Sequence, residues 1–147
     1  MQPGEIRKRV LRDHALLRTG VAEVESLARD VLGGARGLDA RLRSRGDALL
    51  ASLERHMSWE DAHLAPVLRA ADLSGRSREA LLREDHSEQR QVLRYVSEKL
   101  RDTTRPAAVL ARNLLDLTTM LREDMSYEER TFVDAKALRD DGIGAPA

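Results

Sequence analysis

Apolar residues recur every three or four positions along almost the whole chain, which is the period of an amphipathic helix. No segment shows the strict alternation of a half-buried strand. Segments typical of helix ends interrupt the apolar stripe at three places. The pattern predicts four helices: from about residue 6 to the glycines at 33–37, from about 38 to 70–75, from about 77 to 101–106, and from Pro106 to about 138. Pro66 is expected to stop or kink the second helix near its end.

Four helices of this length, joined by short connections, can each bury one apolar stripe by packing side by side and antiparallel. The predicted fold is therefore all-α, an antiparallel up-down-up-down four-helix bundle. A chain of 147 residues has the size of one domain. We expect a single domain over residues 1–147, with its core at about 6–138 and a flexible tail at 140–147.

Charge and composition exclude several classes of partner. Acidic and basic residues balance at 25 each, so no net charge would draw the protein to nucleic acid or to an anionic membrane surface. No apolar run approaches the roughly 18 residues of a membrane-spanning helix. The sequence contains no cysteine and its start lacks the apolar core of a signal peptide, which favours a cytoplasmic protein.

Polar residues nevertheless occupy the inner stripes, and all four histidines of the chain are among them. These residues are His14, His56, Glu60, His63, His86, Gln89, Asp124 and Glu128. An unpaired carboxylate or imidazole in an apolar core costs several kcal/mol, so such residues are expected to satisfy one another or an ion. An α-helix rises about 1.5 Å per residue, and on this scale positions from all four predicted helices reach one level of the bundle. The pattern predicts a buried cation site.

The donor atoms indicate which metals such a site would bind. Imidazole nitrogen and carboxylate oxygen without sulfur suit iron, manganese or zinc better than copper(I) or calcium. The donors exceed what one ion needs, and carboxylates can bridge two ions. We therefore expect two non-heme iron ions with bridging carboxylates, with manganese or zinc as alternatives.

The arrangement resembles the hemerythrin-like (HHE cation-binding) domain family over about residues 6–138. The motifs that carry the resemblance are His14 in "RDHALL", His56 and Glu60 in "HMSWED", His86 in "EDHSEQ", and Glu128 in "DMSYEE". The resemblance implies that Glu60 and Glu128 bridge two metals. It also implies that His14, His56, His86 and Asp124 are terminal ligands.

The sequence departs from the family pattern at two positions. Asp124 stands where the family has a histidine in its fourth helix, and Arg90 stands where a second histidine of the third helix is often found. Substitute ligands on the same stripes are His63 and Gln89, and the residues that follow the two bridging candidates, Asp61 and Glu129, are also candidates. An oxygen-rich ligand set favours the ferric state. It therefore favours redox, peroxide or nitric oxide chemistry, or iron sensing, over reversible carriage of dioxygen.

The predicted function is that of a non-heme di-iron protein that binds or reacts with dioxygen, peroxide or nitric oxide, as a carrier, sensor or detoxifier. If it is an enzyme, it is a di-iron oxidoreductase of peroxide or nitric oxide type. Ferritin-like proteins fit less well, because they need Glu-x-x-His on two helices and only Glu60 to His63 has this spacing. A zinc hydrolase and a metal-free or mononuclear-metal bundle acting as a protein-interaction module remain alternatives.

Individual residues also have structural interpretations. His63 is interpreted as a hydrogen-bonded core residue. His56 and Glu60 are one helical turn apart and can hydrogen bond to each other within their helix. Asp124 and Arg90 can form a buried salt bridge that marks a partly lost site.

Overall fold

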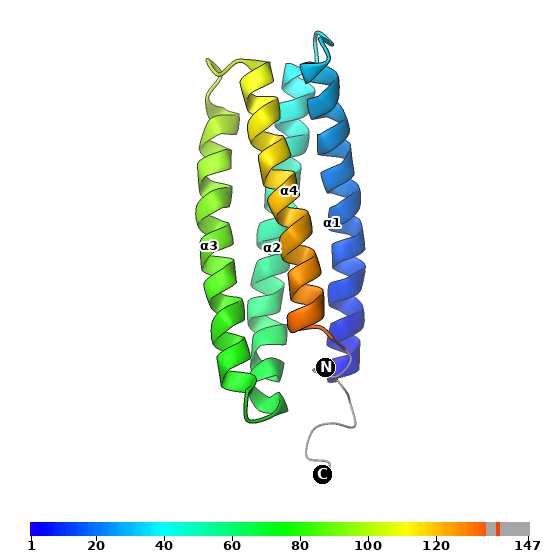
Figure 1. Ribbon diagram of the computed structural model, residues 1–147, viewed down its shortest axis with the longest axis vertical. Coiled ribbons are helices and arrows are strands. Elements are labelled where there is room, and N and C mark those ends of the chain that lie inside the picture. The colour runs from blue at the N-terminus through cyan, green and yellow to red at the C-terminus, as the bar shows by residue number, and fades with distance from the viewer. Residues whose placement is uncertain (135–137, 139–147) are drawn as a thin grey trace.

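The computed structural model describes residues 1–134 and 138 of the chain. Its helices are α1 (Pro3–Leu32), α2 (Asp39–Ala71), α3 (Gly75–Arg101) and α4 (Ala107–Thr131), and the described residues contain no strand. Figure 1 shows successive helices running in opposite directions, as in an up-down-up-down bundle. The predicted all-α four-helix architecture is confirmed. No helix among the described residues combines the length and apolar character needed to cross a lipid bilayer.

The ends of α1 show how local sequence sets the bounds of a helix. Pro3 occupies the first turn, where its missing N–H costs no hydrogen bond. Gln2 and Glu5 form a capping box, in which the backbone N–H of Gln2 donates to the Glu5 carboxylate at 2.9 Å. After the last turn, Gly34 and Gly37 adopt positive φ angles of 99° and 77°, which favour glycine and turn the chain toward α2.

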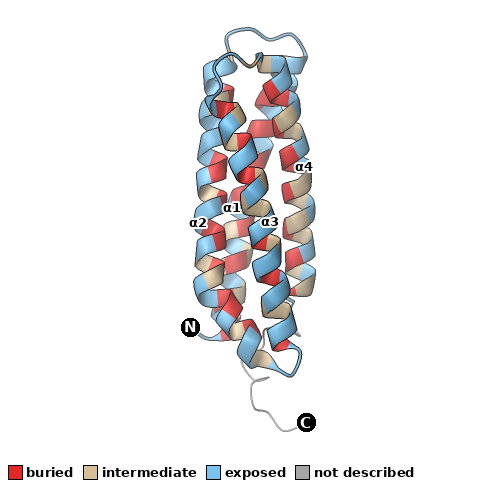
Figure 2. Ribbon diagram, turned by 90° about the vertical axis from the view of Figure 1, so that its left-hand side faces the viewer, coloured by how far each residue is buried: buried red, intermediate tan, exposed pale blue. Residues whose placement is uncertain are grey.

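The buried side chains form two apolar clusters with a polar layer between them. One cluster includes Leu17, Leu53 and Leu121, and the other includes Val10 and Phe132. In Figure 2 the buried positions face the inside of the bundle along all four helices. Along α1, buried His14 lies between Val10 of one cluster and Leu17 of the other. The polar layer is thus shielded by apolar side chains above and below.

The helix bounds differ from the sequence prediction mainly at the end of α4. The predicted fourth helix reached residue 138, but α4 ends at Thr131, and Phe132 and Val133 are buried just beyond it. Arg7 of α1 holds this segment by donating from Nε to the carbonyl oxygen of Val133 at 3.1 Å. Leu138 is buried but not helical. The predicted tail at 140–147 lies outside the described residues.

Two smaller differences concern α2 and α3. Pro66 does not stop α2, which continues to Ala71. Pro66 and Ala62, whose carbonyl group loses its helical donor, are both exposed, so solvent can replace the missing hydrogen bond. The third helix begins at Gly75, two residues before the predicted start.

Candidate metal centre

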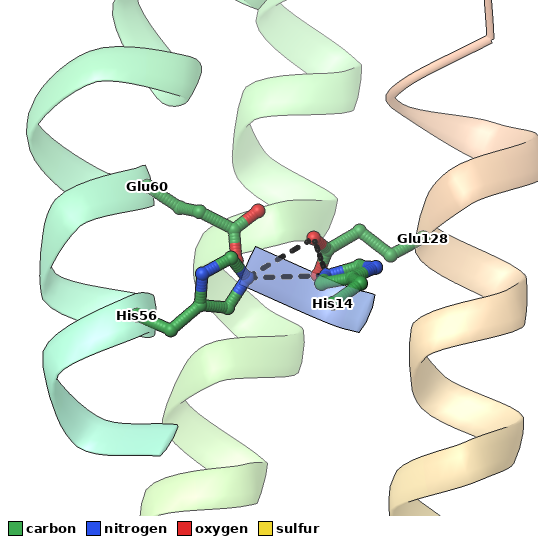
Figure 3. Close-up of side chains that lie close together, drawn as sticks. All are labelled: His14, His56, Glu60 and Glu128. Carbon is green, nitrogen blue, oxygen red and sulfur yellow. Dashed lines mark hydrogen bonds and ion pairs between the residues drawn. The ribbon is translucent and has the colours of Figure 1, made fainter. Parts of the chain in front are cut away.

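Four buried side chains from three helices converge in the polar layer. His14 of α1, His56 and Glu60 of α2, and Glu128 of α4 each offer one donor atom, and these atoms all lie within 4.8 Å of one another. Figure 3 shows the four side chains pointing toward one another between the helices. The two imidazole Nε2 atoms are 3.1 Å apart. His14 Nε2 lies 3.1 Å from Glu128 Oε1, and His56 Nε2 lies 2.6 Å from Glu60 Oε1.

His86 brings the remaining helix, α3, into the same layer. Its side chain is fully buried, and its Nε2 atom lies 3.8 Å from Glu60 Oε1 and 4.0 Å from Glu128 Oε2. The two glutamates therefore stand between His86 on one side and the pair His14 and His56 on the other. A carboxylate in this position has an oxygen available to each side.

The two buried glutamates have opposite electrostatic environments. Burial, followed by the charge of Glu128, raises the pKa of Glu60 well above its usual value. Burial acts in the same direction on Glu128, but the nearby Glu60, His14 and His86 side chains outweigh it and lower the pKa of Glu128. Burial also lowers the pKa of His56. Without a cation, the layer therefore favours the protonated form of Glu60, the ionised form of Glu128 and the neutral form of the His56 imidazole.

This layer contains acceptor atoms that no group of the described protein satisfies. Both oxygens of Glu60, Oε1 of Glu128 and Nε2 of His86 are buried without a hydrogen-bond partner, although ionisable groups lie near them. Buried polar atoms are normally hydrogen bonded, because leaving one unpaired costs about 1–3 kcal/mol. Converging nitrogen and oxygen acceptors without sulfur fit a divalent first-row metal ion. The residues present therefore fit the cation that the sequence predicts.

A second set of carboxylates lies outside the four converging donors, next to the Nδ1 atoms of the buried histidines. Asp61 accepts from His86 Nδ1 at 2.7 Å, and Glu129 Oε2 lies 3.5 Å from His14 Nδ1. Both acids are candidate ligands from their positions in the sequence, but they lie next to the Nδ1 atoms, which point away from the converging donors. Asp13, which lies 3.4 Å from His56 Nδ1, was missed. Its position directly before His14 was the available signal.

Besides His86, three predicted inner positions do not join the four converging donors. The interpretation of His63 as an inner, hydrogen-bonded residue is wrong, because its side chain is exposed and its ring centroid lies 4.8 Å from that of Trp59. The buried stripe of α2 continues from Glu60 to Leu64, a step of four residues, and this leaves His63 outside.

Gln89 and Asp124 are half-buried and line a cavity of about 400 Å³ between α3 and α4, which Glu128 also lines. Burial and the nearby Asp85 raise the pKa of Asp124 to about 6. The predicted salt bridge between Asp124 and Arg90 is wrong, because Arg90 pairs with Asp61 at 2.7 Å and with Glu54 at 3.0 Å.

A helical bundle with a buried layer of histidines and glutamates defines a class, that of four-helix cation-binding proteins. Comparison with known families narrows this class. The model of the hemerythrin HHE cation-binding domain matches residues 5–135, which span all four helices except the first two residues of α1. The chain belongs to this family. No curated protein and no solved structure matches this chain.

Proposed function

We propose that the protein is a non-heme di-iron protein that binds or reacts with dioxygen, peroxide or nitric oxide. The observation that carries the proposal is the set of four buried donor atoms within 4.8 Å, with carboxylate oxygens that lack hydrogen-bond partners. His14, His56, Glu60 and Glu128 would hold one ion. His86 would hold a second, and Glu60 and Glu128 would serve both ions. Membership of a cation-binding family supports this assignment.

Iron bound here would supply an open position for a small ligand and a capacity for one-electron transfer. The chain's own residues limit what reaches it. Apolar clusters cover the layer on both sides along the bundle axis. A cavity of about 440 Å³ between α1 and α2 reaches His56 and is lined by Leu16, Leu17 and Trp59 among others. A small ligand could approach by this side, whereas a bulky substrate could not enter the polar layer.

The donor set favours reactive chemistry over reversible oxygen carriage. Three histidines and two glutamates lie in the layer, and Asp124 supplies no nitrogen at the position where the family pattern has a histidine. Oxygen donors stabilise the ferric state. We therefore favour a role in peroxide or nitric oxide chemistry, or in sensing, in the cytoplasm.

One observation favours a mononuclear site as the second candidate. The four closest donors are sufficient for one tetrahedral ion such as zinc, and His86 Nε2 is further away, at 3.8 Å from Glu60. A protein of this kind would serve as a regulatory interaction module rather than as a redox protein.

Metal analysis of protein purified without chelators separates the two candidates. The proposal predicts two irons per chain after anaerobic loading with ferrous iron. It also predicts a ligand-to-metal absorption band that changes when nitric oxide, peroxide or air is added. One zinc per chain and no iron uptake would favour the mononuclear candidate. The His63→Ala variant is the matched control and should keep both iron and spectrum.

A further inference from the structure

The three buried histidines present their two ring nitrogens to the same kinds of neighbour, but only His56 and His86 hydrogen bond through Nδ1, since His14 Nδ1 lacks a hydrogen-bond partner among the described residues. Nε2 faces the inner glutamates, and Nδ1 faces an outer carboxylate from another helix. The Nδ1 distances are 2.7 Å from His86 to Asp61, 3.4 Å from His56 to Asp13, and 3.5 Å from His14 to Glu129.

Each outer carboxylate is paired in turn with an arginine. Arg90 donates to Asp61 at 2.7 Å, Arg9 donates to Asp13 at 3.0 Å, and Arg18 Nη1 donates to Glu129 at 3.1 Å. The side chains of the three carboxylates are 19–24% exposed, so they lie at the boundary between the polar layer and solvent. The histidine, carboxylate and arginine thus form a chain of contacts that runs outward from the layer, and it occurs three times.

The outer carboxylates occupy a regular place in the sequence. Asp13 precedes His14, Asp61 follows Glu60, and Glu129 follows Glu128. Successive residues of an α-helix point about 100° apart, so one residue of each pair can face the layer while its neighbour faces the adjacent helix.

The contacts also join specific helix pairs. The carboxylate of α1 holds a histidine of α2, that of α2 holds a histidine of α3, and that of α4 holds the histidine of α1. The interface between α3 and α4 has no such contact among the described residues. At this interface Asp85, which precedes His86, lines the cavity together with Asp124. Asp124 is an acid and, unlike a histidine, has no ring N–H to donate to Asp85.

The chemical effect of these contacts is on the tautomer of each imidazole. A neutral imidazole has one N–H and one nitrogen lone pair. When Nδ1–H donates to a carboxylate, the lone pair is left on Nε2, where it can bind a cation, and the ring orientation is fixed. Without such control, Nε2 could carry the hydrogen and could not be a ligand.

We propose that Asp13 and Asp61 are positioning residues that hold His56 and His86 as Nδ1–H tautomers, with Nε2 directed into the layer. Arg9 and Arg90 keep these two carboxylates in place. His14 lies outside this proposal, because its Nε2 is hydrogen bonded to His56 Nε2 at 3.1 Å. The proposal deepens the metal-binding function and rests on it for its biological purpose. The tautomer itself can be measured in the metal-free protein.

Asp61 gives the sharpest test because its contact with His86 is the shortest. We compare the wild type with Asp61→Ala, with the conservative Asp61→Asn, and with Glu54→Gln as the matched control. Glu54 is the other carboxylate that pairs with Arg90, and among the described residues it forms no ion pair with a histidine. Long-range ¹H–¹⁵N spectra at mildly alkaline pH give the His86 tautomer, and competition with a chelator gives the affinity for zinc(II).

We expect wild type and Glu54→Gln to show the Nδ1–H tautomer of His86 and equal zinc affinity. Asp61→Ala should show a mixture of tautomers and bind zinc about 10–100 times more weakly. Asp61→Asn keeps an oxygen acceptor and should recover part of the loss. An unchanged tautomer and a zinc affinity within about twofold of wild type in Asp61→Ala would overturn the proposal.

The two readouts also separate this proposal from the proposed function. If the wild type binds no metal, the proposed function fails, while the tautomer of His86 in the metal-free variants still decides the positioning role. If Asp61→Ala does not fold, as judged by circular dichroism, Asp61→Asn is the test. A partial shift of His86 toward the other tautomer supports the positioning role, and no shift overturns it.

Discussion

Replacing Glu60 with methionine should stabilise the metal-free protein and abolish metal binding. Glu60 is fully buried and neither of its carboxyl oxygens has a hydrogen-bond partner. Methionine has a similar length, is apolar and adapts to irregular space. The substitution therefore removes an unsatisfied polar group without leaving a large void.

The size of the effect follows from the protonation of Glu60. Burial and the charge of Glu128 raise the pKa of Glu60, so the environment favours its neutral form in the metal-free protein. The gain expected from methionine is the cost of a buried polar group without a hydrogen-bond partner, about 1–3 kcal/mol. For a domain of this size it corresponds to a rise in the melting temperature of about 3–12 °C.

Urea unfolding with and without zinc or ferrous iron measures both effects. Metal at 100 times its dissociation constant should stabilise the wild type by about 2.7 kcal/mol and leave Glu60→Met unchanged. Asp47→Leu, an exposed acid on the same helix, is the control and should change the metal-free stability by less than about 0.5 kcal/mol. The reasoning is refuted if Glu60→Met destabilises the metal-free protein by about 1 kcal/mol or more, or if metal stabilises it as much as the wild type.

Three further predictions concern other parts of the bundle. His56→Ala should lose metal, whereas the exposed His63→Ala should retain full metal content, as measured by elemental analysis; equal loss in both variants would contradict the assignment. The pKa of Asp124 is raised to about 6, so ionising it costs folding free energy above that pH and nothing well below its ordinary value. Asp124→Asn should therefore stabilise the metal-free protein by about 1–3 kcal/mol near pH 7 and hardly at all near pH 4, and a gain of equal size at both would contradict this. A Cβ at Gly75 would lie 2.1 Å from the Leu68 carbonyl oxygen, so Gly75→Ala should cost about 1–3 kcal/mol in urea unfolding; a neutral effect would contradict the α2–α3 turn geometry.

The fold could be predicted from the sequence because the four helices bury long regular stripes. The glycines after Leu32 and the proline before Ala107 marked helix ends correctly. The end of α4 could not be predicted, since the apolar residues that continue its period pack as a non-helical segment. Phe132 is fully buried there, and tertiary contacts such as Arg7 with Val133 decide its conformation.

The inner donors could also be predicted, because unpaired polar residues on an apolar stripe are conspicuous. The structure brings His14, His56, Glu60 and Glu128 together. For polar residues three or four positions from these donors, burial could not be predicted, because such a step can place the side chain on either edge of the stripe. His63 is the clearest example.

The partners of the histidine Nδ1 atoms could not be predicted from the sequence for a different reason. Asp13, Asp61 and Glu129 each hold a histidine of another helix, and such pairs depend on the rotation of one helix against its neighbour. Arg90 illustrates the point. Sequence reasoning paired it with Asp124, but it contacts Asp61 across the α2–α3 interface.

The most direct test of the central claim is an anomalous difference map from crystals of iron-loaded protein, collected at the iron absorption edge. The account predicts anomalous density in the buried layer, in contact with His14, His56, Glu60 and Glu128, and a second peak toward His86. A layer without anomalous density, or iron bound only at surface residues such as His63, would contradict it.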